Sequence, residues 1–172
     1  MTTSLSPRIK NNPSLLNLYK LLPEIFNESG EIKIDLLFKN VINYIDERVA
    51  LIERITNFVE ESIEEEVNFV TKLNNTNEEL TKLVEKNTFG EKEVNKSEKI
   101  LEKFAELREI YSYLDKNELY KILVNENQTN IERIEYALST YNDKVVEYNK
   151  FRQTKINSFI SKILRLSDYD VY

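Results

Sequence analysis

Apolar side chains recur along most of the chain at alternating intervals of three and four residues, the spacing of one buried face of an α-helix. The clearest series lies near the end of the sequence, where a Tyr-Asn pair recurs after one heptad. Its apolar and aromatic positions are Ile131, Ile134, Leu138, Tyr141, Val145 and Tyr148. A second series follows Asp35, a residue suited to a helix N-cap. It comprises Phe38, Val41, Ile45, Val49, Ile52, Ile55, Val59, Ile63, Val67 and Val70.

These series predict an all-α fold, a long antiparallel up-and-down four-helix bundle built from three long helices plus a short N-terminal helix. We expect residues 1–12 to be a mobile N-terminal segment, 13–166 a single helical bundle, and 167–172 a C-terminal tail. In chain order the predicted helices are a short one from Pro13, a long one from Asp35 to about Leu83, one from Val94 to Tyr111, and one from Leu119 to about Leu166.

Local sequence also predicts where the helices are interrupted. Turns are expected at residues 27–30 and 87–90, each of which ends in Gly, and a further break at residues 115–117. Because the third predicted helix is much shorter than the second and fourth, strict alternation leaves part of the fourth without a partner. A break at residues 74–77, a kink at residues 125–130, or oligomerisation would each resolve this mismatch, and the pattern does not choose between them.

Composition strengthens the helical prediction and excludes several kinds of chemistry. The 172 residues contain only two Gly, and all three Pro lie near the start, so nothing later in the chain breaks a helix as Pro would. The chain has no Cys and no His. A thiol nucleophile, an imidazole base, a zinc cluster and a ferritin-like di-iron site are therefore excluded. We expect no enzymatic activity, no cofactor and no metal.

The net charge of −6 disfavours nucleic acid as a partner, because phosphates attract a basic face. Charge is unevenly placed, with an acidic run over residues 60–66 and a basic end over residues 150–165. Either segment could be a solvated helix face or a binding surface. No apolar stretch approaches the roughly 20 residues of a membrane span, so we expect a cytoplasmic protein. Membrane contact would be peripheral at most, through an amphipathic face over residues 15–26.

The C-terminal half of the chain contains a long ordered set of motif residues: Arg108-Glu109, Tyr111, Leu114, Asn117, Tyr120, Leu123, Arg133-Ile134, Tyr136-Ala137, Tyr141-Asn142-Asp143, Val145 and Tyr148-Asn149. In this set the chain resembles the LemA family. Earlier, Arg48 and Leu51-Ile52 are similar to part of the family's Arg-x-x-Leu-Ile-Pro-Asn-Leu block. Glu53 and Arg54 replace its Pro-Asn. The usual N-terminal membrane anchor of the family is not predicted here. The resemblance implies a helical bundle and no particular activity.

We therefore predict a non-enzymatic helical scaffold or protein-interaction module. The alternatives are a self-assembling structural protein and a peripheral membrane-surface binder. Expected partners are proteins, membrane-associated or further copies of the chain. The two tyrosines of the repeat are expected in the core, and its asparagines to set helix register through interhelical hydrogen bonds. The candidate interaction or register residues are Tyr141, Asn142, Tyr148, Asn149 and Arg133.

Overall fold

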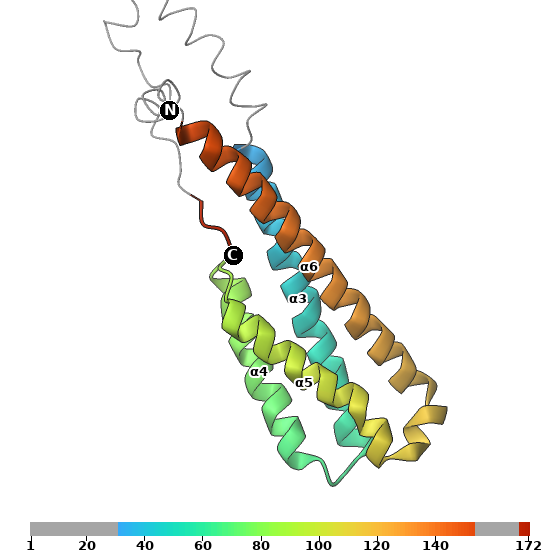
Figure 1. Ribbon diagram of the computed structural model, residues 1–172. Helices are drawn as coiled ribbons and strands as arrows, with labels where there is room; N and C mark the ends of the chain where they lie inside the picture. Colours follow the sequence, from blue (N-terminus) through green and yellow to red (C-terminus); the bar gives the residue numbers. More distant parts are fainter. Residues whose placement is uncertain (1–30, 154–168) are drawn as a thin grey trace, which may run out of the picture. The chain divides into compact units, whose positions relative to one another are not determined.

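The computed structural model describes residues 31–153 and 169–172 and is helical almost throughout (Figure 1). Its elements are α3 (Glu31–Ser62), α4 (Val67–Glu85), α5 (Glu91–Ile110), the short 3₁₀ helix η1 (Ser112–Lys116) and α6 (Glu118–Gln153). No strand occurs among the described residues, so the prediction of an all-α fold is confirmed. The short N-terminal helix predicted from Pro13 lies outside the described residues, as does the predicted end of the last helix.

The described residues divide into two compact units. The larger unit contains residues 37–142 together with Tyr172, and the smaller one contains the start of α3, the end of α6 and residues 169–171. Within the larger unit, each helix runs antiparallel to the helix before it (Figure 1). This is the predicted up-and-down connectivity.

The predicted long second helix is divided into α3 and α4 by a turn at residues 63–66. The alternative break at residues 74–77 is wrong, because these residues lie inside α4. The turn contains neither Gly nor Pro, and its Glu66 N–H donates to the Ile63 carbonyl at 3.1 Å. A carboxylate destabilises the C-terminal end of a helix, which has a partial negative charge. It stabilises the N-terminal end, which has a partial positive charge. The acidic run from Glu60 to Glu66 therefore suits a helix end followed by a helix start.

This division removes the length mismatch noted in the sequence. The two short helices α4 and α5 have 19 and 20 residues, whereas α3 and α6 have 32 and 36. Helix α6 continues through residues 125–130 without interruption. The alternative of a break in the helix at these residues is therefore not observed.

Two further boundaries can be compared with the prediction. The loop at residues 87–90 is confirmed: Asn87 has a positive φ of 50°, and Gly90 is the N-cap of α5. The predicted N-cap role of Asp35 is wrong, because α3 begins four residues earlier at Glu31. In the smaller unit the Asp35 carboxylate instead accepts a hydrogen bond of 2.9 Å from the Tyr169 hydroxyl.

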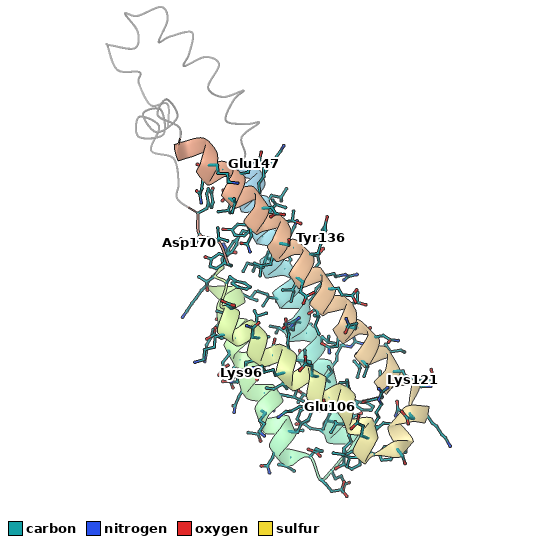
Figure 2. The ribbon with its side chains drawn as sticks, in the orientation of Figure 1. Lys96, Glu106, Lys121, Tyr136, Glu147 and Asp170 are labelled. Carbon is teal, nitrogen blue, oxygen red and sulfur yellow. The ribbon has the colours of Figure 1, made fainter. Side chains whose placement is uncertain are left out.

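Most of the predicted apolar series of α3 is buried, as expected for a core face. On α6 the buried stripe differs from the predicted one in its first half. It contains Tyr120, Leu123, Asn127, Asn130, Ile134, Ala137, Tyr141, Val145 and Tyr148. Asn130 and Ala137 thus occupy the core positions where the apolar pattern placed Ile131 and Leu138, and Asn127 adds a second buried amide. Tyr136 lies on the opposite face and is 75% exposed (Figure 2).

Aromatic packing closes the core near the α3–α4 turn. The ring of Phe104 lies 5.0 Å from that of Tyr120 and 6.1 Å from that of Phe58. The buried Tyr120 hydroxyl donates to the main-chain oxygens of Phe104 at 3.0 Å and Ala105 at 2.8 Å. These carbonyls belong to the last turns of α5, so one side chain of α6 satisfies polar groups of another helix.

Candidate functional site

A buried arginine connects three helices of the larger unit. Arg48 of α3 is fully buried, with 0% of its surface exposed. Its Nε donates to Oδ1 of Asn130 on α6 at 2.8 Å, and its Nη1 donates to Ser97 Oγ at 3.0 Å and Glu98 Oε1 at 3.2 Å on α5. The Asn130 Nδ2 in turn donates to the Tyr44 carbonyl at 2.9 Å. We call Arg48, Ser97, Glu98 and Asn130 the arginine centre.

Burial lowers the pKa of Arg48, because the charged guanidinium loses its hydration. The negative charges of Glu98 and Glu135 oppose this effect, and the hydrogen bond to Glu98 adds to their opposition. Buried charges persist in proteins when they are paired and hydrogen-bonded, and removing one partner is costly. The arginine centre therefore fixes how α3, α5 and α6 pack, and its polar atoms are largely engaged within the protein.

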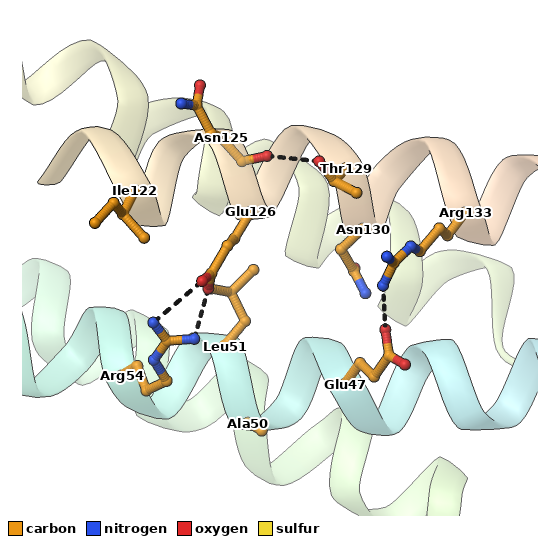
Figure 3. A pocket seen from close by; sticks show the side chains of 10 residues that line it. All are labelled: Glu47, Ala50, Leu51, Arg54, Ile122, Asn125, Glu126, Thr129, Asn130 and Arg133. Carbon is orange, nitrogen blue, oxygen red and sulfur yellow. Dashed lines mark hydrogen bonds and ion pairs between the residues drawn. The ribbon is translucent and has the colours of Figure 1, made fainter. Parts of the chain in front are cut away.

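A shallow groove of about 580 Å³ runs between α3 and α6 on the surface (Figure 3). Ala50, Leu51 and Ile122 supply its apolar part. Two ion pairs cross it: Arg54 to Glu126 at 2.5 Å, and Arg133 to Glu47 at 3.1 Å. The charged groups that line this groove therefore neutralise one another, and each pair joins the same two helices.

The structure places the candidate residue Arg133 at this α3–α6 interface. Besides its ion pair with Glu47, its guanidinium carbon lies 5.9 Å from the centre of the Tyr44 ring, within the range of a cation–π contact. Exposed ion pairs of this kind contribute little individually to the stability of the fold. The proposed role of Arg133 in register or interaction stays a prediction.

The first half of the Tyr-Asn repeat contacts the last residue of the sequence. Tyr141 is buried, as predicted, and its ring lies 5.3 Å from that of Phe38 and 5.9 Å from that of Tyr172, which it stacks against at 24°. The Tyr172 ring also lies 5.9 Å from Phe38 and 5.1 Å from Phe89. Three aromatic rings, from α3, the α4–α5 loop and α6, thus surround one tyrosine.

Asn142 holds the main chain of the same tyrosine. Its Nδ2 donates to the main-chain oxygen of Tyr172, and its Oδ1 accepts from the Tyr172 N–H at 2.8 Å. The amide was expected to bond a neighbouring helix, whereas its described partner is a non-helical segment 30 residues later in the chain. We call Phe38, Phe89, Tyr141 and Asn142 the tyrosine seat.

The second half of the repeat belongs to the smaller unit and is arranged differently. Tyr148 is buried, as predicted, and its ring meets that of Tyr169 edge to face at 5.5 Å. Asn149 is partly exposed. The predicted site residues therefore do not form one cluster: Tyr141 and Asn142 share a site, whereas Arg133 lies at the groove and Tyr148 contacts a different tyrosine.

The arginine centre was not recognised as a site from the sequence. A signal was present, because Arg48 is three residues after Ile45 and four before Ile52 and so falls on the apolar face. On α6, Asn130 likewise stands four residues before an apolar core residue, Ile134. A polar residue at a seam position indicates a buried hydrogen-bonding group, since an unpaired one would be costly.

The acidic run offers no preformed metal site. Glu61 and Glu65 stand four residues apart, but α3 ends at Ser62 between them, so they do not share a helix face. Among the described residues, no group of three or more carboxylates is placed to hold a metal ion. Likewise, the described helices include none that is long and apolar enough to cross a bilayer.

These features define the class of protein: an all-α bundle whose helices are joined by a buried arginine and whose aromatic seat holds a non-helical segment. The sequence model of the LemA family matches residues 37–172, which is most of the chain. The chain therefore belongs to the LemA family, and the resemblance seen in its sequence is confirmed. Comparison with curated proteins and with solved structures gave no significant match in either case.

Proposed function

We propose that this LemA-family protein is a non-enzymatic protein-interaction module, and that the tyrosine seat binds an extended, tyrosine-containing segment of a partner. The observation that carries the proposal is the binding of Tyr172 in the seat, through both its ring and its main chain. A surface that already accommodates one extended segment has the shape and hydrogen-bonding groups to accommodate another.

The chemistry of the seat supports this kind of recognition. An asparagine side chain offers one donor and one acceptor, which match the N–H and oxygen of a single residue in an extended chain. This contact is independent of the side chain that the segment carries. The three aromatic rings then select for a flat side chain, because offset and edge contacts between aromatic rings are favourable.

Tyr172 remains 41% exposed in the seat, so the contact is one-sided. Such a segment leaves more easily than one buried on every side, and a partner segment can therefore compete with it. The absence of His and Cys supports a non-enzymatic role, and so does the engagement of Arg48 in hydrogen bonds within the core.

The test uses the full chain with Tyr172→Ala, which empties the aromatic part of the seat. An acetylated, fluorescent peptide with the sequence of residues 169–172 is titrated into it, and fluorescence anisotropy reports binding. We expect the variant to bind the peptide more tightly than the wild type, in which Tyr172 competes.

Asn142→Ala in the Tyr172→Ala background should weaken binding about ten-fold or more, since two hydrogen bonds of about 1 kcal/mol each are lost. Asn149→Ala is the matched control, the same residue one heptad later on the same helix, and should leave the affinity unchanged. Absence of peptide binding, or an equal effect of both asparagine variants, would refute the proposed function.

A further inference from the structure

A second groove, between α4 and α5, differs from the α3–α6 groove in its charge. Although the chain carries a net charge of −6, five lysines line this groove of about 650 Å³. They are Lys72 of α4 and Lys92, Lys96, Lys99 and Lys103 of α5. Asn75, Asn95 and Ile100 complete the lining. We call this surface the lysine groove; Figure 2 labels Lys96 on α5.

The four lysines of α5 lie along one line. Their positions i, i+4, i+7 and i+11 keep one face of an α-helix, and at 1.5 Å per residue they extend over about 16 Å. All four are exposed. Neighbouring like charges at these spacings destabilise a helix by a few tenths of a kcal/mol per pair. The like charges therefore cost stability, and no ion pair between two residues of α5 offsets this cost.

Little in the described part of the chain neutralises these charges. Lys96 pairs with Glu79 of α4 at 2.7 Å, and it is the one groove lysine with an ion pair to a described residue. In the α3–α6 groove, by contrast, both lining arginines are paired with carboxylates. The lysine groove thus presents a row of ammonium groups ready for carboxylates from outside.

We propose that the lysine groove docks an acidic helical segment of a partner protein, whose carboxylates recur every three to four residues. A helix that lies between two others places one face against both, and glutamates on that face would follow the lysine row. The amides of Asn75 and Asn95 line the groove and can bond polar side chains of the partner. This docking site is separate from the tyrosine seat and does not depend on it.

The shape of the groove and the net charge of the chain favour a protein over other anionic partners. The lysines line a hollow between helices, whereas a bilayer surface meets protruding groups. Nucleic acid carries one charge per about 1.7 Å of duplex, and a protein of net negative charge repels such a dense polyanion. A short helix with a few carboxylates meets the lysine row and little of the remaining negative surface.

The experiment compares two designed helical peptides of identical composition. One carries four glutamates at i, i+4, i+7 and i+11, and the other has the same glutamates distributed around the helix. With the full chain at low salt, we expect the aligned peptide to bind about ten-fold or more tightly, equivalent to about 1.4 kcal/mol. Equal affinity would show unspecific attraction and would overturn the proposal, as would absence of binding.

Charge-reversed variants locate the site. Lys99→Glu with Lys103→Glu should reduce the affinity for the aligned peptide at least ten-fold. Lys39→Glu with Lys116→Glu changes the net charge equally at exposed positions outside the groove and should have a much smaller effect. Circular dichroism checks that both variants fold. Equal losses in the two variants would contradict a specific groove.

Other occupants give distinct results. Vesicles of phosphatidylserine and phosphatidylcholine, or single-stranded DNA, could bind more tightly than the aligned peptide and lose binding with Lys99→Glu and Lys103→Glu. That result would assign the groove to a membrane or to nucleic acid and reject a protein partner. A dimer in light scattering that the same variant dissociates would assign it to a second copy of the chain.

Discussion

Replacing Asn130 by Leu tests the arginine centre. The two side chains are similar in size, but Leu cannot accept the hydrogen bond that Arg48 Nε donates at 2.8 Å. Arg48 has no exposed surface, so no water replaces the lost acceptor. Removing a partner from a buried charge costs about 3–5 kcal/mol. Since Ser97 and Glu98 still bind the guanidinium, we expect the lower end, about 3 kcal/mol.

The assay is urea unfolding followed by far-UV circular dichroism, with the free energy of unfolding obtained by linear extrapolation. Arg54→Met is the surface control. It breaks an ion pair whose side chains are 51% and 42% exposed, and it should cost less than about 1 kcal/mol.

A double variant sharpens this test. Arg48→Met retains most of the apolar stem and removes the charge, so combining it with Asn130→Leu leaves an apolar pair in place of a buried charge without its acceptor. Apolar replacement of a whole buried ionic group is often neutral. We therefore expect the double variant to be more stable than Asn130→Leu alone. A loss below about 1 kcal/mol for Asn130→Leu, or losses that simply add, would refute this reasoning.

Three further predictions concern tyrosines and a surface ion pair. Tyr141→Ala should cost about 3 kcal/mol in urea unfolding, since the buried ring leaves a cavity; a loss below about 0.5 kcal/mol would place the ring at the surface. Burial raises the pKa of Tyr120, so its neutral form stabilises the fold below the unfolded pKa and this contribution is lost as the pH rises through the folded pKa. Ultraviolet titration of the wild type against Tyr120→Phe should reveal one late-ionising tyrosine. The hydrogen bond and the charge of Lys144 lower the pKa of Glu147, so their ion pair stabilises the fold at neutral pH and this contribution is lost in acid. In Lys144→Ala the melting temperature should therefore fall less steeply as the pH is lowered.

Helix faces could be predicted from the sequence because they depend on local periodicity. The series from Val41 to Val59 on α3 is buried as the three-four spacing requires, except for the half-buried Val49. The loop before Gly90 could be predicted for a similar reason, since Gly and Asn tolerate the backbone angles of a helix end. Both features are decided by residues close together in the chain.

The turn between α3 and α4 could not be found by looking for Gly or Pro. It depends on the position of a cluster of carboxylates relative to two helix ends, and helix dipoles act only once the ends exist. The apolar periodicity by itself predicts one helix through α3 and α4, and the apparent mismatch in helix length follows from that prediction.

The tyrosine seat depends on contacts between distant parts of the chain. Asn142 and Tyr172 are 30 residues apart, and Phe38 and Phe89 come from two other elements. The Tyr-Asn repeat drew attention to Tyr141 and Asn142, but the two copies of the repeat have different surroundings. Tyr148 meets Tyr169, whereas Asn142 binds main-chain atoms, and a sequence repeat does not encode that difference.

The most direct test of the proposed function observes the Asn142 side chain by NMR. Its Nδ2 signals in the full chain are assigned by their loss in Asn142→Ala. The account predicts that Tyr172→Ala shifts these signals and that the peptide copying residues 169–172 returns them toward their wild-type positions, while the Asn149 amide signals stay unchanged. Asn142 signals that are unaffected by Tyr172→Ala and by the peptide would contradict the seat as a peptide-binding site.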